Sequence, residues 1–208
     1  LEKKYDVTFI GTPKGDRKDF VKYLVDNGVN IKVFGAGWES YPEFKDIYLG
    51  FLSPEDYTRV INQSKINLCF TKNYVGKTHV IQRFFEINAC KSFELTEYSH
   101  RYAELFKDKS ELVMFKTKEE LLNKIQYYLK NEKEREKIAE RAYKRVLKDF
   151  SKNVEFNKLF KIIFKDQNKP SKQKLPEIKK KTTILNKKDF LLENKKLKEK
   201  YDEFDYFS

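Results

Sequence analysis

The chain has 208 residues, 37% of them charged and 15% aromatic, and its formal net charge at pH 7 is +12. Its 18 Phe and 13 Tyr residues can each bury a large apolar area, so the sequence is apolar enough to form a hydrophobic core. No apolar run is long enough to span a bilayer and no signal peptide is recognisable at the N-terminus, so we expect a cytoplasmic protein.

Apolar runs alternate with segments of helical periodicity through the first 165 residues. Short apolar runs predict strands, and segments with apolar residues three and four apart, opened by a capping residue, predict helices. In chain order we expect strands at 5–11, 29–35, 47–52, 65–70, 93–96 and 111–115, and helices at 13–28, 53–64, 82–90, 99–106, 117–129, 131–150 and 153–164.

Strands that alternate with helices predict parallel βαβ units. The expected fold is therefore α/β, a Rossmann-like doubly wound parallel sheet whose ligands bind at the carboxyl ends of the strands. We assign this domain to residues 1–165. Residues 166–208 hold two prolines, twelve lysines and no glycine, and we expect a Lys-rich tail that is largely extended or disordered, with room for one short helix.

The cysteine and histidine residues argue against a metal site. Cys69 and Cys90 lie in apolar runs without the close spacing of a zinc motif, and only His79 and His100 accompany them. We expect no metal and no cofactor, and we predict that both cysteines are buried, reduced thiols.

The positive charge is suited to an anionic partner: nucleic acid, an acidic membrane surface or a phosphorylated small molecule. Most lysines are interspersed with Asp and Glu, which is typical of a solvated surface. Charge alone therefore does not choose between these partners.

The turn "FIGTPKGDR" joins a predicted strand to a helix. Backbone N–H groups at Gly11 and Thr12, with the helix dipole, can hold a phosphate there, and Lys14 and Arg17 add charge. The turn matches neither GxGxxG nor a Walker loop, and a plain tight turn is the simpler interpretation.

A second glycine turn, "FGAGW", follows the second predicted strand. Gly35 and Gly37 let the backbone approach a ligand closely, and Trp38 packs either against the loop or against a base. A strand-end turn with a buried Trp explains the pattern equally well.

The stretch "IQRFFEINACKSF" places Arg83 and Glu86 three positions apart inside an apolar run. On a helix they share one face and can pair with each other. Alternatively, the planar fork of Arg83 contacts a phosphate while Glu86 accepts hydrogen bonds from a ribose. The predicted helix begins at the ligand edge of the sheet, which favours a ligand site with mutual pairing as its resting state.

From Tyr5 to Phe150 the chain resembles the C-terminal domain of the CgeB-like, or spore-maturation-protein-like, glycosyltransferases. The resemblance rests on three ordered stretches: "VTFIGTPKGDRKDFVKYLVDNGVNIKVFGAGW", "QRFFEINACKSFELTEYSHRYAELF" and "ELVMFKTKEELLNKIQYYLKNEKEREKIAERAYKRVL". It implies the Rossmann-like half of a GT-B enzyme, which binds the nucleotide-sugar donor and generally needs no metal.

The resemblance also assigns residues. Gly11 matches the family's glycine after the first strand, near the donor phosphates, and Arg17 matches its arginine in the following helix turn. Gly35, Gly37 and Trp38 match its G-x-G-W loop. Arg83 and Glu86 match its R-x-F-E motif, whose glutamate resembles an acid that binds the donor ribose. The substrate-binding residues expected are Gly11, Thr12, Arg17, Gly35, Gly37, Trp38, Lys77, Arg83 and Glu86; the catalytic residue stays unknown.

Two departures from the family pattern stand out. The first acid of the related two-glutamate motif falls at Thr78, and the family's "A-C-G-G-F" run is "ACKSF" here, with Lys91 where a glycine would let the backbone approach the sugar. A GT-B reaction also needs an N-terminal acceptor domain, which this length does not include.

The expected function is the donor half of a glycosyltransferase that passes a sugar from a nucleotide sugar to an unknown acceptor hydroxyl. The alternative is a non-catalytic nucleotide- or nucleic-acid-binding protein with the same fold. A continuous basic stripe along the tail and the long helix would favour nucleic acid, and charge gathered at the strand ends would favour the nucleotide sugar.

Overall fold

The computed structural model describes residues 1–72 and 80–167. Most of the predicted tail, from residue 168, lies outside the described residues, so its assignment stays a prediction. Within the described part, no helix is long and apolar enough to cross a membrane.

Five parallel strands form one sheet in the order β2-β1-β3-β4-β5, which confirms the predicted doubly wound α/β fold. Phe9 pairs with Val33 on one side and with Leu68 on the other, so β1 lies between β2 and β3, where the direction of winding reverses. The strands are β1 (Tyr5–Ile10), β2 (Ile31–Phe34), β3 (Ser64–Cys69), β4 (Glu94–Glu97) and β5 (Val113–Phe115).

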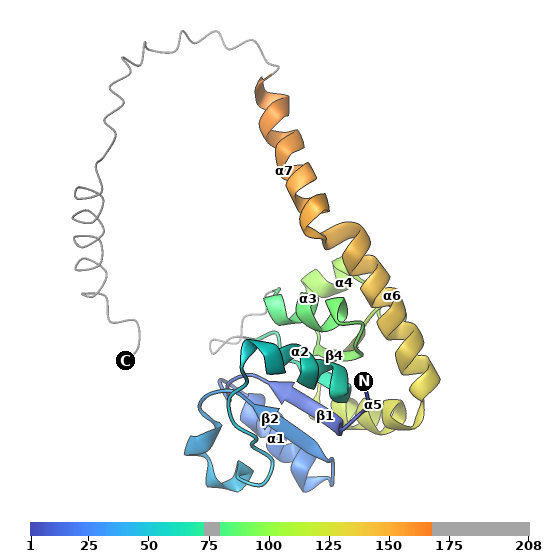
Figure 1. Ribbon diagram of the computed structural model, residues 1–208. Helices are drawn as coiled ribbons and strands as arrows, with labels where there is room; N and C mark the ends of the chain where they lie inside the picture. Colours follow the sequence, from blue (N-terminus) through green and yellow to red (C-terminus); the bar gives the residue numbers. More distant parts are fainter. Residues whose placement is uncertain (73–79, 168–208) are drawn as a thin grey trace, which may run out of the picture. The chain divides into compact units, whose positions relative to one another are not determined.

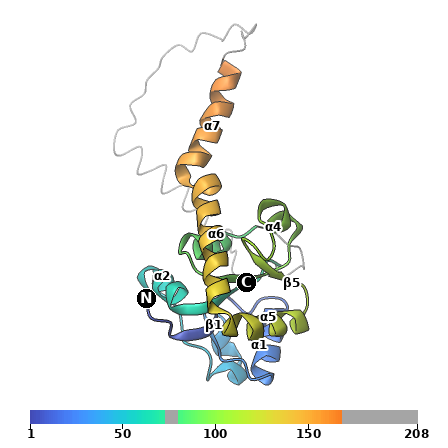
Figure 2. The same cartoon turned by 90° about the vertical axis from the view of Figure 1, so that its right-hand side faces the viewer.

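Helices cover both faces of this sheet, as Figures 1 and 2 show. Side chains of α1 and α5 pack with Phe9 and Leu68 on one face, and side chains of α2, α3 and α4 pack with Ile10 and Cys69 on the other. The helices are α1 (Arg17–Asp26), α2 (Pro54–Gln63), α3 (Gln82–Ala89), α4 (His100–Leu105), α5 (Lys118–Lys130), α6 (Glu132–Phe150) and α7 (Lys152–Gln167).

The two faces of the sheet differ in polarity. The face under α1 and α5 is lined by apolar side chains, whereas the face under α2 and α3 carries a buried polar stripe. In this stripe Thr8 Oγ1 donates to Ser64 Oγ at 2.8 Å, and Asn88 Nδ2 donates to Glu94 Oε2 at 2.6 Å. Hydrogen bonds of this kind satisfy most polar atoms of the stripe, but Oε1 of Glu94 has no hydrogen-bond partner among the described residues.

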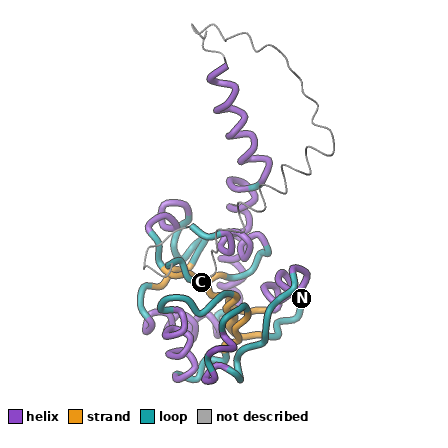
Figure 3. Tube along the Cα trace, turned by 90° about the vertical axis from the view of Figure 1, so that its left-hand side faces the viewer, coloured by secondary structure: helices purple, strands orange, loops and turns teal. Residues whose placement is uncertain are grey.

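The predicted strand at 47–52 is wrong. Ile47 and Leu49 exchange backbone hydrogen bonds with Val33, but only one bridge forms, between Val33 and Tyr48. The backbone then turns at Gly50, whose φ is +88°. The tube in Figure 3 accordingly shows strands only in the centre of the domain, flanked by helices and loops.

The two cysteines have different environments. Cys69 on β3 is fully buried, and burial raises the pKa of its thiol well above the usual value. Cys90, which ends α3, is only partly buried. Both thiols are free, as predicted, but the predicted full burial of Cys90 is wrong because the end of α3 is partly open to solvent.

We expect a thiol reagent to modify Cys90 in the native protein and Cys69 only after unfolding. The rate of alkylation follows access and thiolate fraction, and both are lower for Cys69. Mass spectrometry with and without urea measures the two rates, and the Cys90→Ser variant is the control. Equal native rates at both cysteines would contradict the prediction.

Candidate functional site

An open cavity of about 580 Å³ lies at the carboxyl edge of the sheet, where the helices that follow β1, β2 and β3 begin. Arg17 is the first residue of α1, and Pro54 is the first residue of α2. Among the described residues, the lining consists of Arg17, Pro54, Tyr57, Ile81, Gln82, Arg83 and Glu86. Since β1 and β3 flank the reversal point of the sheet, this is the edge at which doubly wound sheets bind ligands.

The ends of α2 and α3 differ in how they are capped. Ser53 Oγ accepts the N–H of Asp56, so α2 is closed by its own capping side chain. At α3 the N-cap residue is Ile81, which has no side-chain oxygen and makes no side-chain cap. Within the described residues no side chain caps the amides of the first turn of α3, so that part of the chain leaves them to an anion, which the positive end of the helix dipole favours.

Two arginines stand beside the ring of Phe9 at this end. The guanidinium carbons of Arg17 and Arg83 lie 6.0 and 5.8 Å from the ring centroid. Arg17 Nη2 donates to Lys72 O at 3.0 Å. Burial and then the charge of Arg83 lower the pKa of Arg17. Neither arginine is in an ion pair within the described residues, so a bound anion would relieve the repulsion between two like charges.

Glu86 is held by a residue that the sequence did not indicate. The hydroxyl of Tyr57, on α2, donates to Glu86 Oε2 at 2.6 Å. Burial and the hydrogen bond to Glu86 raise the pKa of Tyr57, while the charge of Arg83 and the proximity of its guanidinium to the hydroxyl lower it, so this hydroxyl lies close to both side chains. The expected resting pair between Arg83 and Glu86 is wrong, because no ion pair joins these two described residues.

The glycine turns lie behind the cavity wall and do not line it. Trp38 is 1% exposed and its Nε1 donates to Gly11 O at 2.6 Å, so its indole packs beneath the turn. Gly35 has a φ of +117°, and an added Cβ would lie 2.9 Å from Gly11 O. Gly37 has a φ of +94° and faces Pro13.

Gly11 is the position in these turns that is nearest the arginines. A Cβ there would lie 2.8 Å from the ring of Phe9 and 3.1 Å from Arg83 Nη1. The carbonyl of Thr12, the next residue, accepts a hydrogen bond from Arg17 Nη1 at 3.4 Å. The turn therefore gives both arginines room and helps to orient one of them.

Glu97 is a second residue that sequence reasoning missed. Its buried carboxylate accepts the N–H groups of Thr71 and Lys72 at 3.1 Å each, and it pairs with Lys72 Nζ at 2.5 Å. Because the carbonyl of Lys72 accepts from Arg17, Glu97 positions that arginine indirectly. The predicted site residue Lys77, with Thr78, lies outside the described residues.

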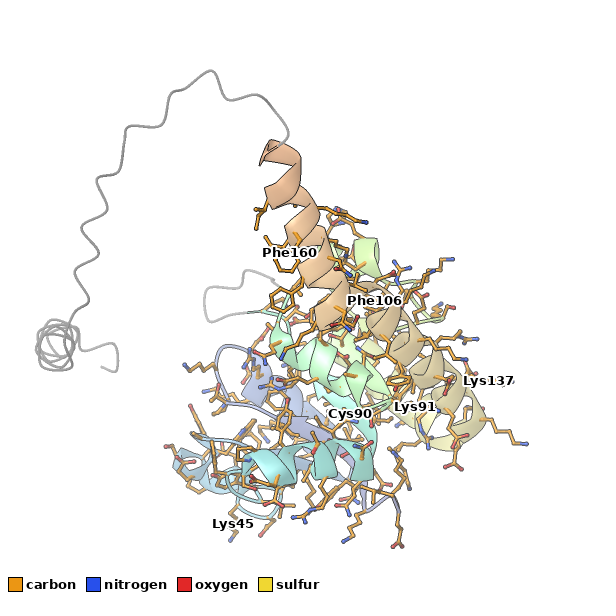
Figure 4. All side chains as sticks on the ribbon, turned by 45° about the horizontal axis from the view of Figure 1, so that its top comes forward. Lys45, Cys90, Lys91, Phe106, Lys137 and Phe160 are labelled. Carbon is orange, nitrogen blue, oxygen red and sulfur yellow. The ribbon has the colours of Figure 1, made fainter. Side chains whose placement is uncertain are left out.

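Lys91 does not lie near the cavity. It follows α3 and precedes β4, so it belongs to the opposite edge of the sheet, and its ammonium pairs with Glu140 of α6. Figure 4 labels Lys91 beside Cys90 at the end of α3. Its φ is +54°, in the left-handed region that favours glycine. Position 91 therefore lies away from the cavity, and its backbone conformation alone favours glycine there.

The comparisons with known proteins agree with this geometry. The family described as glycosyl transferase-like matches residues 17–160. The chain belongs to this family. No curated protein sequence matches the chain.

Solved structures share the fold. Sucrose-phosphate synthase (tll1590) of Thermosynechococcus elongatus is 11% identical with a TM-score of 0.61, over 80% of this chain and 47% of that one. Anabaena Alr3699/HepE, solved with UDP and glucose, is 12% identical with a TM-score of 0.60, over 78% and 48%. The DNA modifying enzyme β-glucosyltransferase, solved with and without its substrate uridine diphosphoglucose, is 16% identical with a TM-score of 0.61, over 79% and 53%.

The chain is thus a glycosyl transferase-like domain whose Rossmann-like fold matches that of GT-B glycosyltransferase structures. The chain spans about half the length of the solved structures that it matches.

Proposed function

We propose that this domain binds the nucleotide-sugar donor of a glycosyltransferase, with Arg17 and Arg83 at the diphosphate and Glu86 at the ribose. The observation that carries the proposal is the set of groups that line the cavity. Arg17, Arg83 and the N-terminus of α3 lie there with one carboxylate, Glu86, and neither arginine is in an ion pair within the described residues. A nucleoside diphosphate carries the matching groups, a diphosphate and a ribose diol.

The chemistry would be displacement of the nucleoside diphosphate from the anomeric carbon of the sugar by an acceptor hydroxyl. Negative charge develops on the departing diphosphate, and preorganised positive groups stabilise it. Arg17 and Arg83 would do this together with the N–H groups of α3, and Lys77 remains a predicted third contributor. We assign no catalytic base to the described residues.

The subfamily, the cellular location and a second domain are further parts of the proposal, and each has its own support. The CgeB-like subfamily is supported by the three ordered sequence stretches that resemble it. A cytoplasmic location is supported by the two free cysteines. A second domain that binds the acceptor is supported by the solved structures, which are about twice as long as the matched part.

Calorimetric titration with UDP, GDP, ADP and CDP tests the proposal. We expect one of them to bind, and Glu86→Gln to weaken its binding by about 1.5–3 kcal/mol, the scale of a hydrogen bond to a charged group. The melting temperature should stay the same, because Glu86 is not half of a buried ion pair.

The control variant is Glu43→Gln, an exposed carboxylate in the short 3-10 turn Pro42–Phe44. If no nucleotide binds while a single-stranded oligonucleotide does, the nucleic-acid alternative replaces the proposal. Unchanged nucleotide binding by Glu86→Gln with a lowered melting temperature would make the Arg83–Glu86 motif part of the scaffold.

A further inference from the structure

The spacing of Arg83 and Glu86 poses a problem for the cavity in its empty state. Residues at i and i+3 of a helix lie on one face, where opposite charges attract. If the two side chains paired, Glu86 would neutralise the positive charge that the diphosphate needs. Arg83 would in turn occupy the carboxylate that the ribose needs. They do not pair, although the cavity they line is open.

The contact that replaces this pair comes from another helix. Tyr57 Oη, on α2, donates to Glu86 Oε2 at 2.6 Å, a short, charge-assisted hydrogen bond. Oε1 of Glu86 has no protein hydrogen bond within the described residues. Tyr57 itself is fixed, because its ring packs against the cluster of buried residues between α2, α3 and the sheet.

We propose that Tyr57 is a positioning residue that holds the Glu86 carboxylate away from Arg83, so that both remain available to ligand. The inference rests on the proposed function and adds a role for a residue on a different element. With the Tyr57 hydroxyl removed, the carboxylate rotates to Arg83. The diphosphate and ribose contacts are then weakened together.

Two probes and one double mutant test this role. The probes are inorganic pyrophosphate, which needs only the positive groups, and the nucleoside diphosphate that the unmodified protein binds. We expect Tyr57→Phe to weaken both by about three- to tenfold, the scale of one hydrogen bond. Glu86→Gln should weaken the nucleotide and leave pyrophosphate unchanged.

The double variant Tyr57→Phe/Glu86→Gln gives the decisive result. Without a carboxylate at 86, nothing remains to capture Arg83, so pyrophosphate binding should return to the level of the unmodified protein. Nucleotide binding should be no weaker than in Glu86→Gln alone. A residue that merely supports the cavity wall would show no such rescue.

Tyr127→Phe is the matched control, because Tyr127 Oη donates to Glu134 at 2.8 Å on a separate, exposed part of the domain. This variant should change neither affinity.

If Tyr57→Phe leaves both affinities unchanged, the positioning role is overturned while the proposed function stands. The same holds if the loss of pyrophosphate affinity persists in the double variant. If pyrophosphate is too weak to measure, the nucleotide cycle decides, and additive losses overturn the role. If the unmodified protein binds no nucleotide, the proposed function falls and the inference falls with it.

Discussion

Replacing Gly35 by alanine is expected to lower the free energy of unfolding by about 3–5 kcal/mol. The new Cβ would lie 2.9 Å from the carbonyl oxygen of Gly11, a backbone atom that cannot rotate away. The φ of +117° adds backbone strain of about 1–3 kcal/mol for any L residue with a side chain. The overlap adds a similar amount, as in overpacked cores.

Gly28→Ala separates strain from overlap. Gly28 has a φ of +74°, but a Cβ there would meet nothing within 4 Å. We expect it to cost only about 1–2 kcal/mol, the price of one left-handed residue. Urea denaturation of the two variants measures the difference, and equal losses would show that the contact between Gly35 and Gly11 relaxes freely.

Gly35→Ala should also change the geometry of the cavity. Gly11, which the new Cβ at position 35 would displace, has the ring of Phe9 and Arg83 as close neighbours, so its displacement disturbs the place of Arg83. Nucleotide affinity should therefore fall in Gly35→Ala even under conditions in which the variant is folded, and should stay unchanged in Gly28→Ala.

Much of the fold could be predicted because its signals are local. Five of the six expected strands are present, and the side chains of Ser53 and Thr117 cap α2 and α5, two of the expected helices. The segment 47–52 was misleading because apolar composition does not reveal whether both faces become buried. Leu49 and Phe51 are exposed, so this segment lacks the packing that would complete a strand.

The site was predictable only where its residues form a contiguous motif. Arg83 and Glu86 stand in one helical stretch, and Arg17 follows a strand-end glycine, so pattern alone located all three. Tyr57 contacts a residue 29 positions away. Glu97 contacts the backbone of Thr71, 26 positions away. Such contacts depend on how α2, α3 and β4 are placed, which no spacing rule encodes.

Burial at the core of the domain makes Glu94 a source of pH dependence. Glu94 is 2% exposed, accepts one hydrogen bond from Asn88, and leaves Oε1 without a partner. Burial raises the pKa of this carboxyl well above its usual value of 4.5, and the nearby hydrogen bonds, which lower the pKa, do not offset this effect. The folded state therefore holds the Glu94 proton more tightly than the unfolded state does.

The sign of the effect follows from linkage. The contribution of Glu94 to stability is complete below its unfolded pKa near 4.5 and is lost as pH rises through its higher folded pKa. Glu94→Gln keeps the shape of the protonated side chain and cannot ionise. We expect this variant to differ least from the unmodified protein near pH 5 and to be more stable by about 2–4 kcal/mol near pH 9, since an uncompensated buried ion costs several kcal/mol.

Urea denaturation at several pH values between 5 and 9 measures this difference. Glu43→Gln, on the surface, should leave the pH dependence of the unmodified protein intact. If the unmodified protein is equally stable across this range, or if Glu94→Gln falls in parallel with it, then Glu94 does not carry the effect. The hydrogen bonds that lower the pKa of Glu94, together with the weaker effect of the Arg83 charge, would then outweigh burial and keep this carboxyl ionised in the folded state.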